Sequence, residues 1–232
     1  FFTPVMRRLA TCPRVIVLGT PPEGLTGDAR VTQRAPEGFT RSLGKEIGKG
    51  GTSQLVYVAP GAARAVDSTL EFFLSPKSAY VSGQVVRIGA EGSLAAGKAT
   101  HPSRPLEVKI ALVTGASRVI GEQFARVLHR AGATVVGVDV PQAASELVAL
   151  MTELEGDHLA LDITHTDAAQ RIAHHLASEH GGVDIVVHNA GITRDKKLAN
   201  MADDRWNSVM AVNLTAPSTI TRELLDQGVI ND

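Results

Sequence analysis

The glycine-rich turn Thr114-Gly115-Ala116-Ser117-Arg118-Val119-Ile120-Gly121 contains the residues of this chain that are best suited to hold a phosphate. An apolar run expected to form a strand precedes it, and a helical pattern follows. At such a junction, unpaired backbone N–H groups and the positive end of the helix dipole both point toward a bound anion. We therefore predict a nucleotide site here. Its contacts are expected from Gly115, Ser117, Arg118, Ile120 and Gly121.

Val119 departs from the usual chemistry of this turn, because a third glycine occupies this place in glycine-rich turns of the same pattern. The missing side chain of that glycine lets the backbone approach the pyrophosphate. A β-branched Cβ is expected to collide with the phosphate or to strain the turn. We therefore expect Val119 to weaken the binding that the turn predicts.

Asp139 ends the next predicted strand, where an acidic side chain could accept hydrogen bonds from both ribose hydroxyls of an adenosine. A carboxylate in that place repels a 2′-phosphate, so this interpretation predicts NAD, with NADH preferred over NADPH. The alternative is that Asp139 merely caps the turn before Pro141. The glycine turn upstream favours ribose recognition.

Four landmarks in order resemble the short-chain dehydrogenase/reductase family over about residues 107–232. They are Thr114-Gly115 to Gly121, Asp162-Ile163, Asn189-Ala190-Gly191, and Trp206 to Asn213-Leu214. The segment from Asn189 to Asp195 is most similar to the 3-oxoacyl-acyl-carrier-protein reductases. The resemblance implies reduction of a β-keto thioester to the 3-hydroxyacyl form, in fatty-acid metabolism, by a protein that is usually homo-oligomeric.

The same resemblance implies a role for each matching residue. Asp162, followed by Ile163, would bind the adenine amino group, and Asn189, Ala190 and Gly191 would line the cofactor cleft. Asn213 would be the catalytic-tetrad residue that helps to hold a water of the proton relay. The serine, tyrosine and lysine of the tetrad would follow in a later segment, where tyrosine protonates the substrate while the nicotinamide gives hydride.

The sequence ends at Asp232, before that segment is expected to begin. We therefore expect a truncated chain that is inactive by itself. The alternative is a non-catalytic nucleotide-binding remnant, or pseudoenzyme.

The first 90 residues resemble the later half of the same family in a degenerate form. Segments 14–20, 56–61 and 80–84 are similar to its late strands, and 37–46 to the helix that carries tyrosine and lysine. The tyrosine position then falls on Ala29 and the lysine position on Gln33, and neither can act as an acid. The whole chain is similar to an internal piece of the two-domain, high-molecular-weight, NADH-dependent reductases, which begin with a degenerate flavodoxin-like domain.

These comparisons divide the chain into three parts. Residues 1–90 would be the C-terminal half of a degenerate flavodoxin/Rossmann-like domain, 91–107 a Gly/Pro/Ser-rich linker, and 108–232 the NAD-binding N-terminal half of a ketoreductase domain.

The elements that must position the site alternate in a βαβ rhythm after the linker. Strands are predicted at 108–114, 134–139, 158–162 and 183–188, and helices at 121–131, 143–154, 168–179 and about 203–227. Before the linker, strands are predicted at 13–20, 55–58 and 84–88, with one helix over 37–47 that begins near Pro36, since proline is tolerated only in the first turn.

The fold class is therefore α/β, a Rossmann-like doubly wound parallel sheet that is present as two partial halves. The alternative is one circularly permuted sheet, in which strand 13–19 would pair beside strand 183–188.

Composition excludes several other functions. With 23 basic and 24 acidic residues the net charge is −1, which gives no footprint for nucleic acid. No run of about 18 apolar residues exists to span a membrane, and the single cysteine, Cys12, fits a reducing cytoplasm. None of the eight histidines are spaced i, i+4, so no metal site is expected. The expected partners are a small-molecule cofactor and an acyl thioester substrate.

Overall fold

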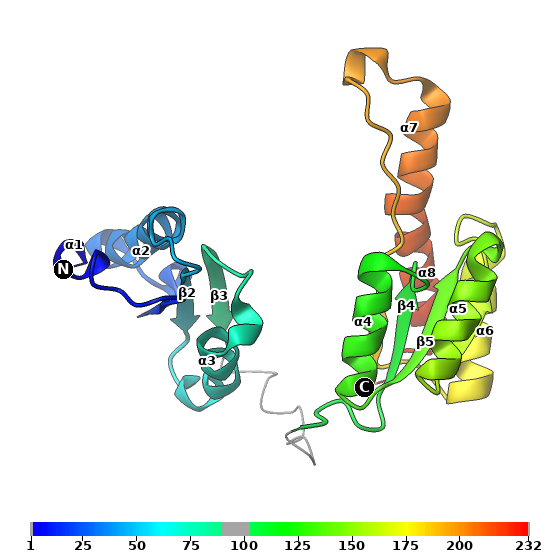
Figure 1. Cartoon of the computed structure of the whole chain (residues 1–232), viewed down its shortest axis with the longest axis horizontal. Helices are drawn as coiled ribbons and strands as arrows, with labels where there is room; N and C mark the ends of the chain where they lie inside the picture. The colour runs from blue at the N-terminus through cyan, green and yellow to red at the C-terminus, as the bar shows by residue number, and fades with distance from the viewer. Residues whose placement is uncertain (1, 90–102, 232) are drawn as a thin grey trace. The chain divides into compact units, whose positions relative to one another are not determined.

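The computed structural model describes residues 2–89 and 103–231. The chain divides into two compact units, Phe1–Lys98 and Ala99–Asp232. Each unit has its own parallel sheet, with strand order β1-β2-β3 in the first and β6-β5-β4-β7 in the second (Figure 1). The α/β class with parallel sheets is confirmed. The described strands are segregated by half, with β1 to β3 in one sheet and β4 to β7 in the other, which agrees with two partial halves and contradicts one circularly permuted sheet. Most of the expected linker, residues 91–102, lies outside the described residues.

The first unit is built around its central strand. Leu55, Val56 and Tyr57 of that strand are buried, because it has a neighbour on each side and helix α2 packs against it. The elements are α1 (Thr3–Met6), β1 (Arg14–Gly19), α2 (Gly27–Glu46), β2 (Thr52–Val58), α3 (Asp67–Leu74) and β3 (Gln84–Ile88). The three strands match the prediction closely, whereas the short helices α1 and α3 were not predicted.

Helix α2 begins at Gly27, so the predicted start near Pro36 is wrong, and Pro36 lies inside the helix. The early turns are anchored by polar contacts that an apolar periodicity does not reveal. The Gln33 side-chain oxygen accepts a hydrogen bond from Thr20 N at 2.8 Å, and the Tyr57 hydroxyl donates to the Gln33 carbonyl at 2.5 Å. These contacts hold the first turns of α2 over the sheet and offset the backbone hydrogen bond that Pro36 cannot make.

The second unit alternates strands and helices as predicted, with boundaries that differ by a few residues. Its elements are β4 (Ile110–Thr114), α4 (Val119–Arg130), β5 (Thr134–Asp139), α5 (Ala144–Glu153), β6 (Asp157–Ala160), α6 (Ala168–His180), β7 (Ile185–Val187), α7 (Asp203–Met210) and α8 (Ala216–Asp226). All three strand pairs are parallel, and β4 lies between β5 and β7.

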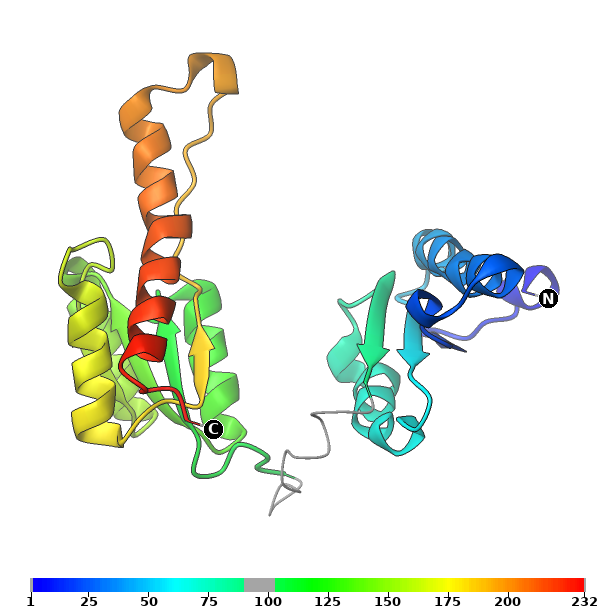
Figure 2. The ribbon, with the colours of Figure 1, turned by 180° about the vertical axis from the view of Figure 1, so that it is seen from behind.

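Helices cover both faces of the second sheet. Successive side chains of a strand point to opposite faces, so its apolar residues contribute to a core on each side. Leu112 and Val136 pack into a core with α6 and α8. Val113 and Val135 pack on the other side, with α4 and α5. Figure 2 shows α6 and α8 on the face that lies away from the viewer in Figure 1. The result is the doubly wound arrangement, in which ligands bind at the carboxyl ends of the strands.

The helix expected at about 203–227 is present as three consecutive helical segments over Asp203–Asp226. Between α7 and α8 the five residues Ala211–Thr215 form a π-helical segment, which contains Asn213. Single π turns inside helices are rare and are frequent at functional sites. In the part of the chain that the structure describes, no helix combines the length and the apolar character needed to cross a bilayer.

Candidate nucleotide-binding site

A cavity of about 490 Å³ lies at the carboxyl end of the second sheet. Ten of the predicted site residues line it, and four further residues, Val140, Thr164, Ile192 and Val212, line it without having been predicted. The predicted residues are Gly115, Arg118, Ile120, Gly121, Asp139, Asp162, Ile163, Asn189, Ala190 and Gly191, and Val119 lies among them. The fold therefore brings segments from four successive strand ends around one space. Ser117 and Asn213 are not among the lining residues, but each is hydrogen-bonded to one of them, Ser117 to Asp139 and Asn213 to Ile192.

The glycine turn is shaped by close approaches that exclude side chains. Gly115 has φ +65°, and a Cβ placed on it would lie 2.9 Å from the Ala190 Cα. A Cβ on Gly121 would overlap the Gly115 carbonyl. The two glycines therefore let the turn, the start of α4 and the loop at Asn189 pack closely together, and both glycines line the cavity beside the first turn of α4. Backbone N–H groups at a helix N-terminus can bind an anion.

Val119 adopts a backbone conformation that suits glycine. Its φ is +52°, in the left-handed region that costs a β-branched residue energy. Its side chain lines the cavity and is 73% exposed. The Val119 side chain therefore lies where a bound pyrophosphate would approach the turn. The Val119 backbone has the left-handed conformation that glycine adopts most easily.

Asp139 is bonded to the glycine turn. Its Oδ2 accepts hydrogen bonds from Ser117 N at 3.0 Å and from the Ser117 hydroxyl at 2.6 Å, and its Oδ1 accepts from Val140 N at 2.8 Å. The carboxylate thus caps the chain before Pro141, as the alternative interpretation expected, and it also faces the cavity. A carboxylate has about four acceptor positions, so capacity for a ribose hydroxyl is left.

Asp162 follows β6 and faces the same cavity. Its Oδ1 accepts from Thr164 N at 2.9 Å and from the Thr164 hydroxyl at 2.7 Å. The Thr164 backbone N–H, followed by the hydroxyl, lowers the pKa of Asp162. The side chain is therefore an ionised acceptor that is held at one oxygen, suited to an amino group such as that of adenine.

Thr114 and Asn189 join β4 to the segment after β7. The Thr114 hydroxyl oxygen accepts from Asn189 N and Ala190 N, each at 3.1 Å. The Asn189 side-chain amide donates to the carbonyls of Thr114 and Gly115 at 3.1 and 3.0 Å. Sequence reasoning did not list Thr114 as a site residue. A hydroxyl at the end of an otherwise apolar strand is the signal that could have found it.

Asn213 holds Ile192, one of the residues that line the cavity, through two hydrogen bonds. Its side-chain oxygen accepts from Ile192 N and its side-chain nitrogen donates to Ile192 O, both at 2.9 Å. The π-helical segment thereby holds the chain that continues from Asn189. His188 lies outside the cavity lining and contacts the Thr221 hydroxyl at 2.8 Å. Burial lowers the pKa of His188.

Comparisons with known proteins agree with this geometry. Residues 109–230 match the family model described as short chain dehydrogenase. A solved Pseudomonas syringae protein described as a short chain dehydrogenase superposes with a TM-score of 0.50 at 29% identity, over 54% of this chain and 55% of that one.

Curated relatives cover a similar share. The 3-oxoacyl-[acyl-carrier-protein] reductase FabG of Vibrio harveyi is 40% identical over 120 residues, which is 52% of this chain and 49% of the relative. Nodulation protein G of Rhizobium meliloti is 44% identical over 120 residues, 50% of this chain and 48% of the relative. The chain therefore spans about half the length of the curated relatives it matches.

Proposed function

Because this chain belongs to the short-chain dehydrogenase family, we propose that its second unit binds NADH and serves a 3-oxoacyl-acyl-carrier-protein reductase. The observation that carries the proposal is that the glycine turn, Asp139, Asp162 and Asn189 all line the same cavity. The similarity to FabG proteins supports the reductase class. When bound, NADH would supply the hydride for reduction of a β-keto thioester.

The residues fit the parts of the dinucleotide in turn. The turn from Gly115 to Gly121, which lines the cavity at the start of α4, would take the pyrophosphate. Asp139 would accept from the adenosine ribose, and Asp162 from the adenine amino group. The loop from Asn189 to Gly191 would line the nicotinamide half, positioned by Thr114 and Asn213. Asp139 would repel a 2′-phosphate, which supports NADH over NADPH.

A second function, nucleotide binding without catalysis, is favoured by the residues of α2. Its Ala29 and Gln33 stand where the family resemblance places tyrosine and lysine. The Gln33 side chain is engaged by Thr20 N at 2.8 Å, and Ala29 has no group that could donate a proton. On this proposal the first unit is a degenerate flavodoxin/Rossmann-like half that supplies no acid.

The test is a titration of the 232-residue polypeptide with NADH and NADPH, followed by cofactor fluorescence. Asp139→Ser should lower the preference for NADH at least about tenfold, equal to about 1.4 kcal/mol, because the repelling carboxylate is gone while Arg118 still lines the cavity. Ser117→Ala is the matched control. It removes the 2.6 Å hydroxyl contact with Asp139 but keeps the carboxylate, so the preference should persist.

The same samples test the non-catalytic function directly. With acetoacetyl thioester added, the polypeptide is expected to bind NADH without oxidising it, because Ala29 and Gln33 provide no proton donor. Steady oxidation of NADH would contradict the non-catalytic function. Absence of saturable binding of either cofactor would overturn the proposed site.

A further inference from the structure

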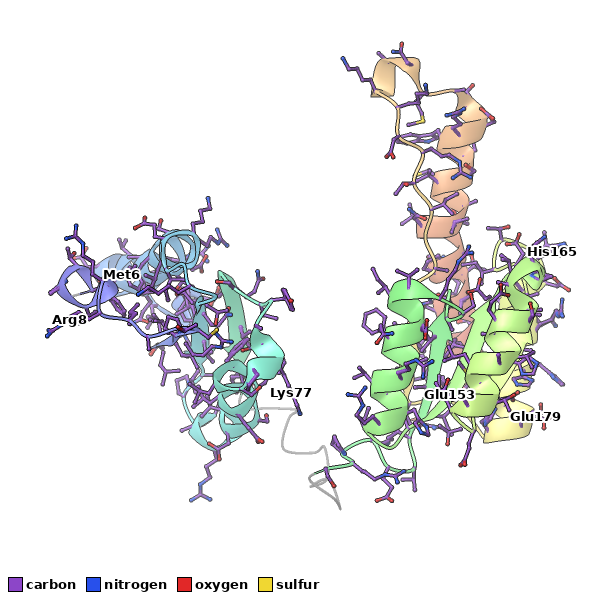
Figure 3. All side chains as sticks on the ribbon, viewed as in Figure 1. Met6, Arg8, Lys77, Glu153, His165 and Glu179 are labelled. Atoms are coloured by element: carbon purple, nitrogen blue, oxygen red, sulfur yellow. The ribbon has the colours of Figure 1, made fainter. Side chains whose placement is uncertain are left out.

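Three metal-ligating side chains converge at the end of β6 that lies away from the cavity. Asp157 is the first residue of β6, and His175 and His180 lie in the last turns of α6. The Asp157 Oδ2 is 2.6 Å from His175 Nε2 and 3.0 Å from His180 Nε2. One ligand atom from each residue lies within 4.8 Å of the other two. In Figure 3 this end of α6 can be found by the label of Glu179, the residue before His180.

The three side chains are held in place by backbone structure. The Asp157 Oδ1 accepts from His158 N at 2.6 Å, which turns Oδ2 toward the imidazoles. Helix α6 ends at His180, and Gly181 adopts the left-handed conformation, with φ +70°, that stops a helix. Within the described residues, the side chains that lie within hydrogen-bonding distance of the Asp157 Oδ2 are the two imidazoles.

We propose that Asp157, His175 and His180 bind a divalent transition-metal ion of the zinc class. Two imidazoles and one carboxylate form a nitrogen and oxygen set that suits Zn²⁺. In a tetrahedral zinc site with bonds of about 2.0–2.2 Å, neighbouring ligand atoms lie about 3.3 Å apart. The observed N–O separations of 2.6 and 3.0 Å reach that value through side-chain shifts of less than about 1 Å.

The three side chains of the cluster are partly buried, so the site is shielded by the protein on one side and open to solvent on another. The side chains of His180, His175 and Asp157 are 13%, 21% and 33% exposed. An ion can therefore enter from solvent, and the fourth tetrahedral position stays open for a water. Mg²⁺ and Ca²⁺ prefer sets made wholly of oxygen ligands, so the two imidazoles select against them.

The sequence spacing explains why no metal site was expected. His175 and His180 are five residues apart on α6, and the third ligand comes from a separate element, so the i, i+4 criterion does not find the cluster.

The proposed ion would fasten the end of α6 to the start of β6. Asp157 begins β6 and Asp162 comes two residues after its end, so the two residues are five positions, or about 16 Å, apart when extended. The metal and the proposed nucleotide would therefore occupy separate edges of the sheet. Zinc is expected to raise the melting temperature of the second unit and to leave NADH affinity unchanged, since distant sites act independently.

The test uses the untagged chain, freed of metal by a chelator and titrated with ZnCl₂ by calorimetry. We expect one zinc ion per chain. His175→Gln and His180→Gln should weaken zinc binding at least about tenfold, the lower end of the effect of disturbing even outer-shell partners. Glutamine keeps an N–H that can donate to Asp157, so the variants preserve a hydrogen-bond clamp while removing a ligand. His174→Gln, an exposed position on the same helix, is the matched control and should bind like the parent.

A second readout keeps the outcome clear if a variant is destabilised. Co²⁺ added to the parent chain should give the visible absorption of a tetrahedral site, which zinc should abolish. Equal zinc affinity in the parent and both ligand variants would overturn the proposal. Absence of stoichiometric binding in the folded parent would also overturn it and leave the cluster as a hydrogen-bonded clamp.

Discussion

Val119 adopts the left-handed backbone conformation that usually requires glycine. At φ +52° its Cβ is crowded, and its side chain projects to the cavity. The sequence alone predicted either a collision with phosphate or strain in the turn, and the structure puts the residue in the strained region. Gly115 and Gly121, on either side of Val119, are themselves closely packed against Ala190 and the Gly115 carbonyl.

Val119→Gly is therefore expected to stabilise the second unit by about 1 kcal/mol, since relief of left-handed strain exceeds the entropy cost of glycine. It should also tighten NADH binding, because the side chain leaves the approach to the turn. Urea denaturation and NADH titration measure the two effects. Val127→Gly on the same helix is the control and should destabilise by about 0.5–1 kcal/mol. If both variants lose stability equally, the strain at Val119 is negligible.

At the scale of elements, apolar strands were predicted well and polar anchoring was not. The strands β3 and β5 were predicted at their observed bounds because runs of valine and isoleucine are bounded by turn residues. The start of α2 was missed because its early turns are held by Gln33 and Tyr57 through polar contacts. The Asp157 cluster was missed for a related reason, since its members come from two elements that only the fold brings together.

Pro36→Ala should stabilise the first unit by about 1–3 kcal/mol, because alanine restores a backbone N–H inside α2 and removes the clash of the ring with the preceding turn. The two tyrosines of the chain, Tyr57 and Tyr80, both belong to this unit, so tyrosine fluorescence in urea follows its unfolding. Val31→Ala, at an exposed position of the same helix, should change stability by less than about 0.5 kcal/mol. A loss of stability in Pro36→Ala would show that packing of the ring outweighs the restored bond.

At the scale of the whole molecule, each unit has its own sheet and its own buried strands. The single tryptophan, Trp206, lies in the second unit, so its fluorescence follows that unit separately. In the second sheet, Asp184 joins the start of β7 to the start of β4, because it accepts from Lys109 Nζ at 2.6 Å and from Ile110 N at 2.8 Å. Burial would raise the pKa of Asp184, but these hydrogen bonds outweigh burial and lower it.

Asp184→Asn should therefore lower the free energy of unfolding of the second unit by about 1–2 kcal/mol at neutral pH. Because the folded pKa is lowered, the contribution is present above the unfolded value of about 3.9 and is lost as pH falls through the folded pKa. The gap between parent and variant should close below about pH 4 when Trp206 is followed, and the tyrosine signal should not change. A gap that persists in acid would assign the effect to packing. Asp226→Asn, at an exposed position, serves as the control.

The hydroxyl of Thr114 gives the second unit a thermodynamic linkage. The same oxygen that accepts from Asn189 N and Ala190 N lies 3.4 Å from the Val187 carbonyl at the end of β7. A ligand that immobilises Asn189 thereby also favours the pairing of β7 with β4. The same hydrogen bonds of Thr114 then support both the ligand-binding loop and the folded sheet. The fraction of this unit that is folded should therefore rise with ligand concentration.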